Sequence, residues 1–177
     1  MKKILPFVSI DTGLYFNLAT LMVVLSRLSL NSRGRYVLDF ERLQYFIYLV
    51  KNPARIEPVL MLSGKKIPSF DSRHIHTLES MSSNVDILFQ SEKLRSLITR
   101  LASVGFLGTV ASKDGNRTYY LSEDGEIFLQ SMIEADHEAE GYMSSLIKFS
   151  NAISGLQSLP LTKLSSIISQ VFREEAI

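Results

Sequence analysis

The sequence predicts a mainly α-helical protein with one small β-hairpin. Three observations support this fold class: apolar residues recur at helical spacing in several stretches, one Asp-Gly pair separates two short extended runs, and 46% of the 177 residues are hydrophobic. The chain has no cysteine. It must therefore form its core without disulfides, and thiolate metal sites and cysteine nucleophiles are excluded.

The N-terminal segment, residues 1–38, is predicted to contain a helix over residues 14–30. Apolar residues lie on nearly every side of this helix, so more than one of its faces must be covered. Either it runs through the core or it supplies an interface. Asn17 and Thr20 interrupt the apolar run, which is too short to span a membrane, and the run near the N-terminus is too short for a signal sequence. We expect a cytoplasmic protein with no membrane partner.

Residues 39–135 are predicted to form the central unit of the fold, which begins with two helices and a short piece between them. Asp39 can cap the first helix, and Asn52-Pro53 closes it. A short helical or irregular piece is expected over residues 56–62. Helical spacing returns over residues 75–89, which lead almost directly into a third helix.

The third helix, the hairpin and a fourth helix follow one another closely. Ser91 can cap the third helix, and Gly105 lies where a left-handed cap would end it. The apolar stripe of this helix is formed by Leu94, Leu97, Ile98, Leu101 and Val104. Two extended runs, 106–111 and 117–121, then flank the Asp-Gly turn. Ser122 can cap the fourth helix, which carries three acidic residues in its first turn. This order is typical of a winged helix-turn-helix, here with N- and C-terminal helical extensions.

In a winged helix, the helix 91–104 takes the recognition position and the hairpin forms the wing. Cations on both elements are candidates for contact with nucleic-acid phosphates: Lys93, Arg95, Arg100, Lys113 and Arg117. The charge is unevenly distributed, since residues 1–120 carry 16 Lys or Arg against 9 Asp or Glu, and residues 121–177 carry 3 against 9. Solvated cations on an outer face, or contact with protein instead of DNA, explain the same residues equally well.

The C-terminal extension, residues 136–177, is predicted to contain helices over residues 142–149 and 161–172. The last helix has a narrow apolar stripe that must pack against something. Two surfaces are possible, the core near the wing or a partner protein. The candidate partner-binding residues are Leu164, Ile167, Ile168, Val171 and Phe172.

Candidate catalytic and metal-binding residues are few. His74 and His76 diverge if this stretch begins a helix, and they lack a third ligand. His137 lies in a charged run typical of a solvated face. Residues 63–66, Ser-Gly-Lys-Lys, lack the spacing of a phosphate-binding loop. We therefore expect no enzyme activity, no cofactor and no metal.

Four short motifs occur in order between residues 38 and 130. They are Leu38-Asp39-Phe40-Glu41-Arg42-Leu43, Val50-Lys51-Asn52-Pro53, Glu92-Lys93-Leu94 with Gly105-Phe106-Leu107, and Tyr119-Tyr120-Leu121-Ser122. In this order and spacing the chain resembles the small middle components of three-component ABC systems, including the small subunit of Lamassu-type defence complexes.

The resemblance implies a non-catalytic winged-helix adaptor subunit in prokaryotic defence against phage or plasmids. Such a subunit binds the head region of an SMC-like ATPase and helps couple it to a nuclease effector, and it meets double-stranded DNA through the complex. The alternative function is a free-standing, dimeric winged-helix transcriptional regulator. A regulator would purify alone as a symmetric dimer and bind a palindromic site, whereas a complex subunit would need its ATPase.

Overall fold

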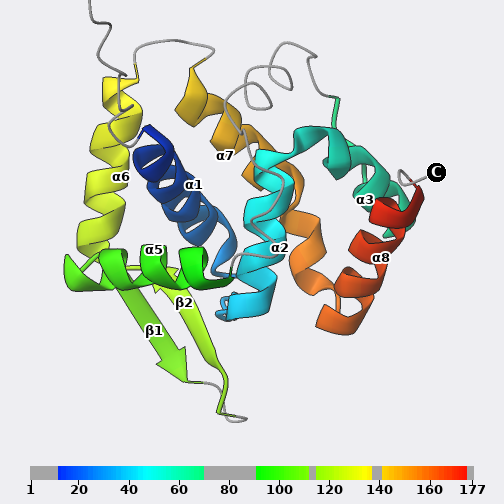
Figure 1. Cartoon of the computed structure of the whole chain (residues 1–177), viewed down its shortest axis with the longest axis horizontal. Coiled ribbons are helices and arrows are strands. Elements are labelled where there is room, and N and C mark those ends of the chain that lie inside the picture. The colour runs from blue at the N-terminus through cyan, green and yellow to red at the C-terminus, as the bar shows by residue number, and fades with distance from the viewer. Residues whose placement is uncertain (1–11, 70–90, 112–114, 137–140, 175–177) are drawn as a thin grey trace, which may run out of the picture.

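The computed structural model describes residues 12–69, 91–111, 115–136 and 141–174 of the chain (Figure 1). It confirms a mainly helical fold with one two-stranded antiparallel sheet. The helix predicted over residues 75–89 lies outside the described residues. The elements are α1 (Thr12–Leu28), α2 (Phe40–Lys51), the 3₁₀ helix η1 (Pro53–Arg55), α3 (Ile56–Leu62), α5 (Ser91–Ser103), β1 (Leu107–Ala111), β2 (Arg117–Leu121), α6 (Glu123–Ala135), α7 (Tyr142–Ala152), the 3₁₀ helix η3 (Ser154–Ser158) and α8 (Leu161–Glu174).

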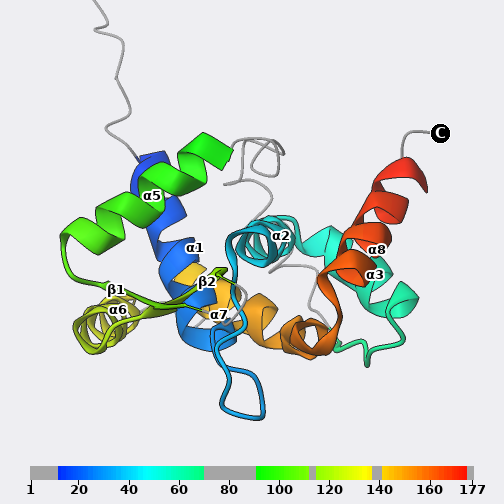
Figure 2. The same cartoon turned by 90° about the horizontal axis from the view of Figure 1, so that it is seen from below.

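Helix α1 is the centre of the fold. It packs against α2, α5, α6, α7 and β2, and both views place it between α6 on one side and α2 and α7 on the other (Figures 1 and 2). Its second half is core, since every residue from Leu21 to Leu25 is almost fully buried. Its first turn is not, because Tyr15 is 69% exposed. The helix ends two residues earlier than predicted, since Leu30 pairs with Tyr36 in a β-bridge instead.

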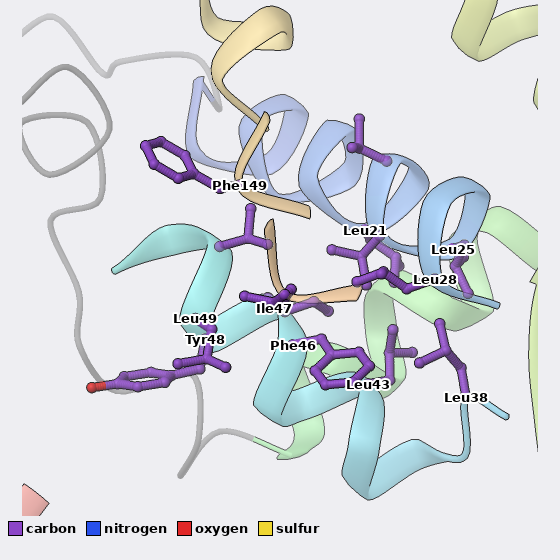
Figure 3. Packing of buried hydrophobic residues seen from close by; sticks show 14 of the residues in the cluster. Leu21, Leu25, Leu28, Leu38, Leu43, Phe46, Ile47, Tyr48, Leu49 and Phe149 are labelled. Atoms are coloured by element: carbon purple, nitrogen blue, oxygen red, sulfur yellow. The ribbon is translucent and has the colours of Figure 1, made fainter. Parts of the chain in front are cut away.

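Helix α2 begins and ends where the sequence predicts. The Asp39 side chain accepts a hydrogen bond from the backbone N–H of Arg42 at 2.8 Å, and Asn52 ends the helix immediately before Pro53. The helix buries Leu43 and Phe46 against α1, and Figure 3 shows these side chains beside Leu21 and Leu28. Local capping and the apolar stripe are therefore sufficient to define this element.

The hairpin pairs Leu107 with Leu121 at its base and Ala111 with Arg117 toward its tip. Gly108 in β1 leaves space for the ring of Tyr120 on the opposite strand, because a Cβ at position 108 would lie 2.2 Å from a carbon of that ring. The backbone N–H of Tyr119 donates to the carbonyl of Leu38 at 2.8 Å, which fixes the start of α2 beside β2.

The C-terminal helices belong to the same packed core. Helix α7 lies against α1 and α2 and buries Leu146 and Phe149 completely. Helix α8 packs mainly against α3 and α2, and in both views it lies at the opposite end of the molecule from α6 (Figures 1 and 2). One cluster of buried residues draws side chains from α1, from the central elements and from α7 and α8. No described helix combines the length and apolarity of a membrane span.

Candidate partner and nucleic-acid surfaces

The apolar stripe of α8 is covered by the chain itself. Of the five residues proposed for partner binding, Leu164, Ile167, Ile168 and Val171 are at most 6% exposed, and Phe172 is half-buried. The ring of Phe172 lies 5.1 Å from that of Tyr48 in α2, centre to centre. The core accounts for the burial of this stripe, because α2 and α3 cover it and its residues belong to the same buried cluster as Leu121 at the base of the hairpin.

The three candidate cations on α5 do not form one stripe. At 3.6 residues per turn, Arg95 and Arg100 are about 140° apart around the helix, whereas Lys93 and Arg100 are only about 20° apart. The guanidinium of Arg95 lies 4.9 Å from the centre of the Phe40 ring, at the start of α2. Arg95 therefore faces the α2 side, and Lys93 and Arg100 share the other edge of the helix.

The outer face of α5, between these two edges, is polar and carries little charge. Ser96, Thr99 and Ser103 are exposed there, together with Glu92. The hydroxyl of Thr99 donates to the carbonyl of Arg95 at 2.9 Å, and that of Ser103 donates to the carbonyl of Arg100 at 2.8 Å. Because these two hydroxyls bond to their own helix, the face has few donors directed outward.

The remaining predicted cations are on the hairpin. Arg117 is exposed and lines a hollow of about 480 Å³ with Asn116 and Phe40. Two acidic residues, Asp39 and Glu41, line the same hollow and offset its charge. Lys113 lies outside the described residues. Arg95 and Arg117 thus both lie near Phe40, the first over its ring and the second in the hollow that Phe40 lines, in a setting that is not strongly positive.

Lys51 is a buried cation that sequence reasoning did not single out. Its ammonium group donates to the side-chain oxygen of Asn17 in α1 and lies 5.2 Å from the centre of the Phe16 ring. Burial, and then the nearby charge of Lys93, lower the pKa of Lys51 to about 8. A lysine in the last turn of a helix normally indicates a solvated side chain, so the sequence carries no signal of this burial.

An apolar groove of about 470 Å³ is lined by residues of α1, α5 and α6. Figure 1 shows how these three helices are arranged. Its exposed apolar side chains are Tyr15 at 69%, Val104 at 58% and Phe128 at 44%. Arg100 is the one charged residue among the described residues that line it. The full lining is Leu14, Tyr15, Leu18, Ala19, Met22, Arg100, Leu101, Ser103, Val104, Phe106, Phe128 and Met132.

The sequence contained a partial signal of this groove. The apolar residues on nearly every side of α1 left an interface open, and Tyr15 belongs to that pattern. Val104 was instead predicted to be in the buried stripe of α5. That prediction is wrong, because α5 ends at Ser103 and Val104 lies in the turn that Gly105 completes with a positive φ of 79°.

Metal-binding geometry is absent from the part of the chain that the structure describes, where no three His, Asp or Glu side chains gather. The three histidines considered above, His74, His76 and His137, lie outside the described residues. The described residues thus offer surfaces for binding other molecules, and the apolar groove is the most distinctive of them.

Residues 28–166 match the model of a protein family described as ABC-three component (ABC-3C) system Middle Component 4. The match extends from the last residue of α1 through the first part of α8, which is more than three quarters of the chain. No curated protein and no solved structure matches the chain significantly.

Proposed function

The chain belongs to the Middle Component 4 family of ABC-three component systems, and from this premise we propose that it is a non-catalytic adaptor subunit of an SMC-like ATPase complex. In this proposal it binds the head region of the ATPase and helps couple it to a nuclease effector. The complex acts in the cytoplasm in defence against phage or plasmids, as Lamassu-type systems do. Family membership carries this proposal, because a middle component implies other subunits of the same system.

The order of the central elements supports a winged helix as the framework of the adaptor. Helix α5 precedes the β1–β2 hairpin directly, and α6 follows it with Ser122 as its cap. The hydrogen bond from Tyr119 to Leu38 attaches the hairpin to the start of α2. In a winged helix, α5 would take the recognition position and the hairpin would form the wing.

The distribution of surface charge favours contact with protein over direct reading of DNA. A DNA-reading helix usually presents several cations and base-contacting side chains on one face. Here Arg95 is turned toward Phe40, and the outer face of α5 carries Glu92 with short hydroxyl side chains. The apolar groove, by contrast, leaves Tyr15, Val104 and Phe128 exposed around one hollow, as surfaces that bind protein do.

The test is purification of the tagged, full-length protein from its native host, with the co-purifying chains identified. We expect a large SMC-like ATPase to be recovered together with a nuclease subunit. A preparation that repeatedly yields this chain without an ATPase would overturn the proposal.

One observation favours the second candidate, a free-standing DNA-binding regulator. Arg95 lies over the ring of Phe40 and Arg117 lines a hollow with it, and the two cations lie on elements that contact DNA in winged-helix regulators. A regulator would be a symmetric dimer when purified alone and would bind a palindromic site. Light scattering of the isolated chain, with gel-shift assays on genomic DNA fragments, separates this function from that of the adaptor.

A further inference from the structure

The groove between α1, α5 and α6 is the described surface whose chemistry is least explained by the folding of this chain. We propose that it is the docking site for an apolar segment of the ATPase subunit, and that this segment carries one carboxylate that pairs with Arg100. The inference rests on the proposed function and identifies the surface through which the adaptor holds the ATPase.

The walls of the groove have the composition of a protein–protein contact. Tyr15 provides aromatic surface on the first turn of α1 and Phe128 on α6, and Val104 provides aliphatic surface just after the end of α5. These three side chains remain 69%, 44% and 58% exposed in the folded chain. Exposed aromatic side chains around a hollow are typical of binding hot spots, because a partner buries a large area with little loss of side-chain entropy.

The walls are held in place before any partner binds. The hydroxyl of Ser26 on α1 donates to the carboxylate of Glu126 on α6 at 2.8 Å. The rings of Phe106 and Phe128 stack with their centres 4.9 Å apart, which connects the hairpin to α6. Leu101 of α5 is buried beneath the groove. A preformed groove binds with a smaller entropy cost than one that must be assembled.

The charge of the groove specifies its occupant. The Arg100 guanidinium has no hydrogen-bond or ion-pair partner among the described residues, and no described residue lining the groove is acidic. A purely apolar occupant would cover this cation and leave it without solvent or a counter-ion, which is costly. An occupant with a carboxylate at the α5 side would satisfy it through a charge-assisted hydrogen bond.

The shape of the site argues against a second copy of the same chain. In a two-fold dimer with this groove on the axis, a hollow would face a hollow. Neither groove would then be filled. A convex apolar segment of a different subunit would fill the groove. The wall that α1 contributes lies outside residues 28–166, which match the family.

The experiment compares tagged variants of the full-length chain in the native host. We expect Tyr15→Asp and Val104→Asp to lower the recovery of the ATPase at least about tenfold, as loss of a hot-spot residue does. Arg100→Glu should lower it similarly, and Arg100→Lys should retain part of it. The matched control is Met61→Asp, which places the same charge on a 63% exposed apolar residue of α3 and should leave recovery unchanged.

The outcomes separate the docking site from the proposed function. Failure of the wild-type chain to recover an ATPase overturns the proposed function itself. Recovery of the ATPase by wild type and equally by the groove variants overturns only the docking site. A dimer of the isolated chain that Tyr15→Asp dissociates assigns the groove to a second copy. If the groove variants still capture the ATPase but have a lowered melting temperature, the groove is occupied by a segment of this chain. This result and the dissociable dimer each overturn the inference.

Discussion

The guanidinium of Arg95 lies over the ring of Phe40, 4.9 Å from its centre. This contact joins α5 to the beginning of α2 through two residues that are 55 positions apart in the chain. The sequence makes Arg95 one of the candidates for DNA contact. Its guanidinium is instead directed toward a neighbouring aromatic side chain, where it contributes to packing.

The first prediction concerns this contact. Replacing Arg95 with Met keeps most of the apolar stem but removes the cation, so we expect the free energy of unfolding to fall by about 0.5–1 kcal/mol. Arg95→Lys should lower the free energy of unfolding by less, because it keeps the cation. Urea denaturation of the isolated chain measures both, with Lys163→Met on the exposed side of α8 as the control. Equal stability of Arg95→Met and the control would show that the stacking contributes nothing.

The second prediction concerns nucleic acid. Arg100→Glu combined with Arg117→Glu should weaken salt-sensitive DNA binding by the chain and reduce the salt slope by about two, one for each lost phosphate contact. The control is Arg33→Glu with Lys65→Glu, which changes two cations of a separate polar hollow near η3. DNA affinity is measured across a salt series for both double variants. Equal affinities would exclude the surface formed by α5 and the hairpin as the DNA-contact surface.

Much of the local structure could be predicted because its causes are local. Asp39, Ser122 and Gly105 begin or end their helices as expected, since each acts within a few residues of its own position. The two runs on either side of the Asp114-Gly115 pair do pair as strands. The kinship with the middle components of three-component ABC systems, predicted from four short motifs, is confirmed by the family match.

The candidate surfaces were less predictable because they depend on distant parts of the chain. The stripe of α8 shows that the helix must pack, but not that α2 and α3 cover it. The groove joins three helices whose sequences give no indication of their relative placement. Val104 continues the apolar spacing of α5 and is nevertheless exposed, since the helix ends one residue earlier. Periodicity describes one helix at a time, and it cannot identify which neighbour covers a given face.

The third prediction is a pH dependence caused by Lys51. Its pKa is lowered to about 8 in the folded protein, from 10.5 in the absence of burial. Between these two values the unfolded chain binds more protons than the folded one, so the free energy of unfolding should rise as the pH is raised through this window. In Lys51→Met this rise should be smaller by roughly 2–3 kcal/mol.

Chemical denaturation of both proteins at pH 7.5 and at about pH 10 measures the difference. The comparison isolates Lys51, because Tyr142, whose pKa is raised by burial, is present in both proteins. Parallel pH profiles for the wild type and Lys51→Met would show that Lys51 is not desolvated in solution.

The fourth prediction uses the last helix. Ile168 is 3% exposed, so Ile168→Asp places an unpaired charge in the contact of α8 with its neighbours. We expect a loss of at least about 3 kcal/mol, visible as partial or complete unfolding by circular dichroism. Ser166→Asp, on the exposed side of the same helix, should fold normally. A folded Ile168→Asp protein that has lost a partner would instead assign the stripe to an interface.

The fifth prediction contrasts two glycines that both lie in helices. Replacing a helical glycine with alanine normally stabilises a protein by about 0.5–1 kcal/mol, because it reduces the conformational entropy of the unfolded chain. Gly13 in α1 meets this condition, since a Cβ there would have no neighbour within 4 Å. Gly125 in α6 does not, because its Cβ would lie 2.6 Å from the carbonyl oxygen of Phe106 and 2.8 Å from Leu121.

Gly125→Ala must therefore push α6 away from the hairpin, and we expect it to lower the free energy of unfolding by about 1–3 kcal/mol. Gly13→Ala should raise it or leave it unchanged. Urea unfolding of the two variants under identical conditions gives the comparison. A stabilised Gly125→Ala protein would mean that α6 does not pack tightly on the hairpin, and the wall that Phe128 contributes to the groove would then not be fixed in advance of binding.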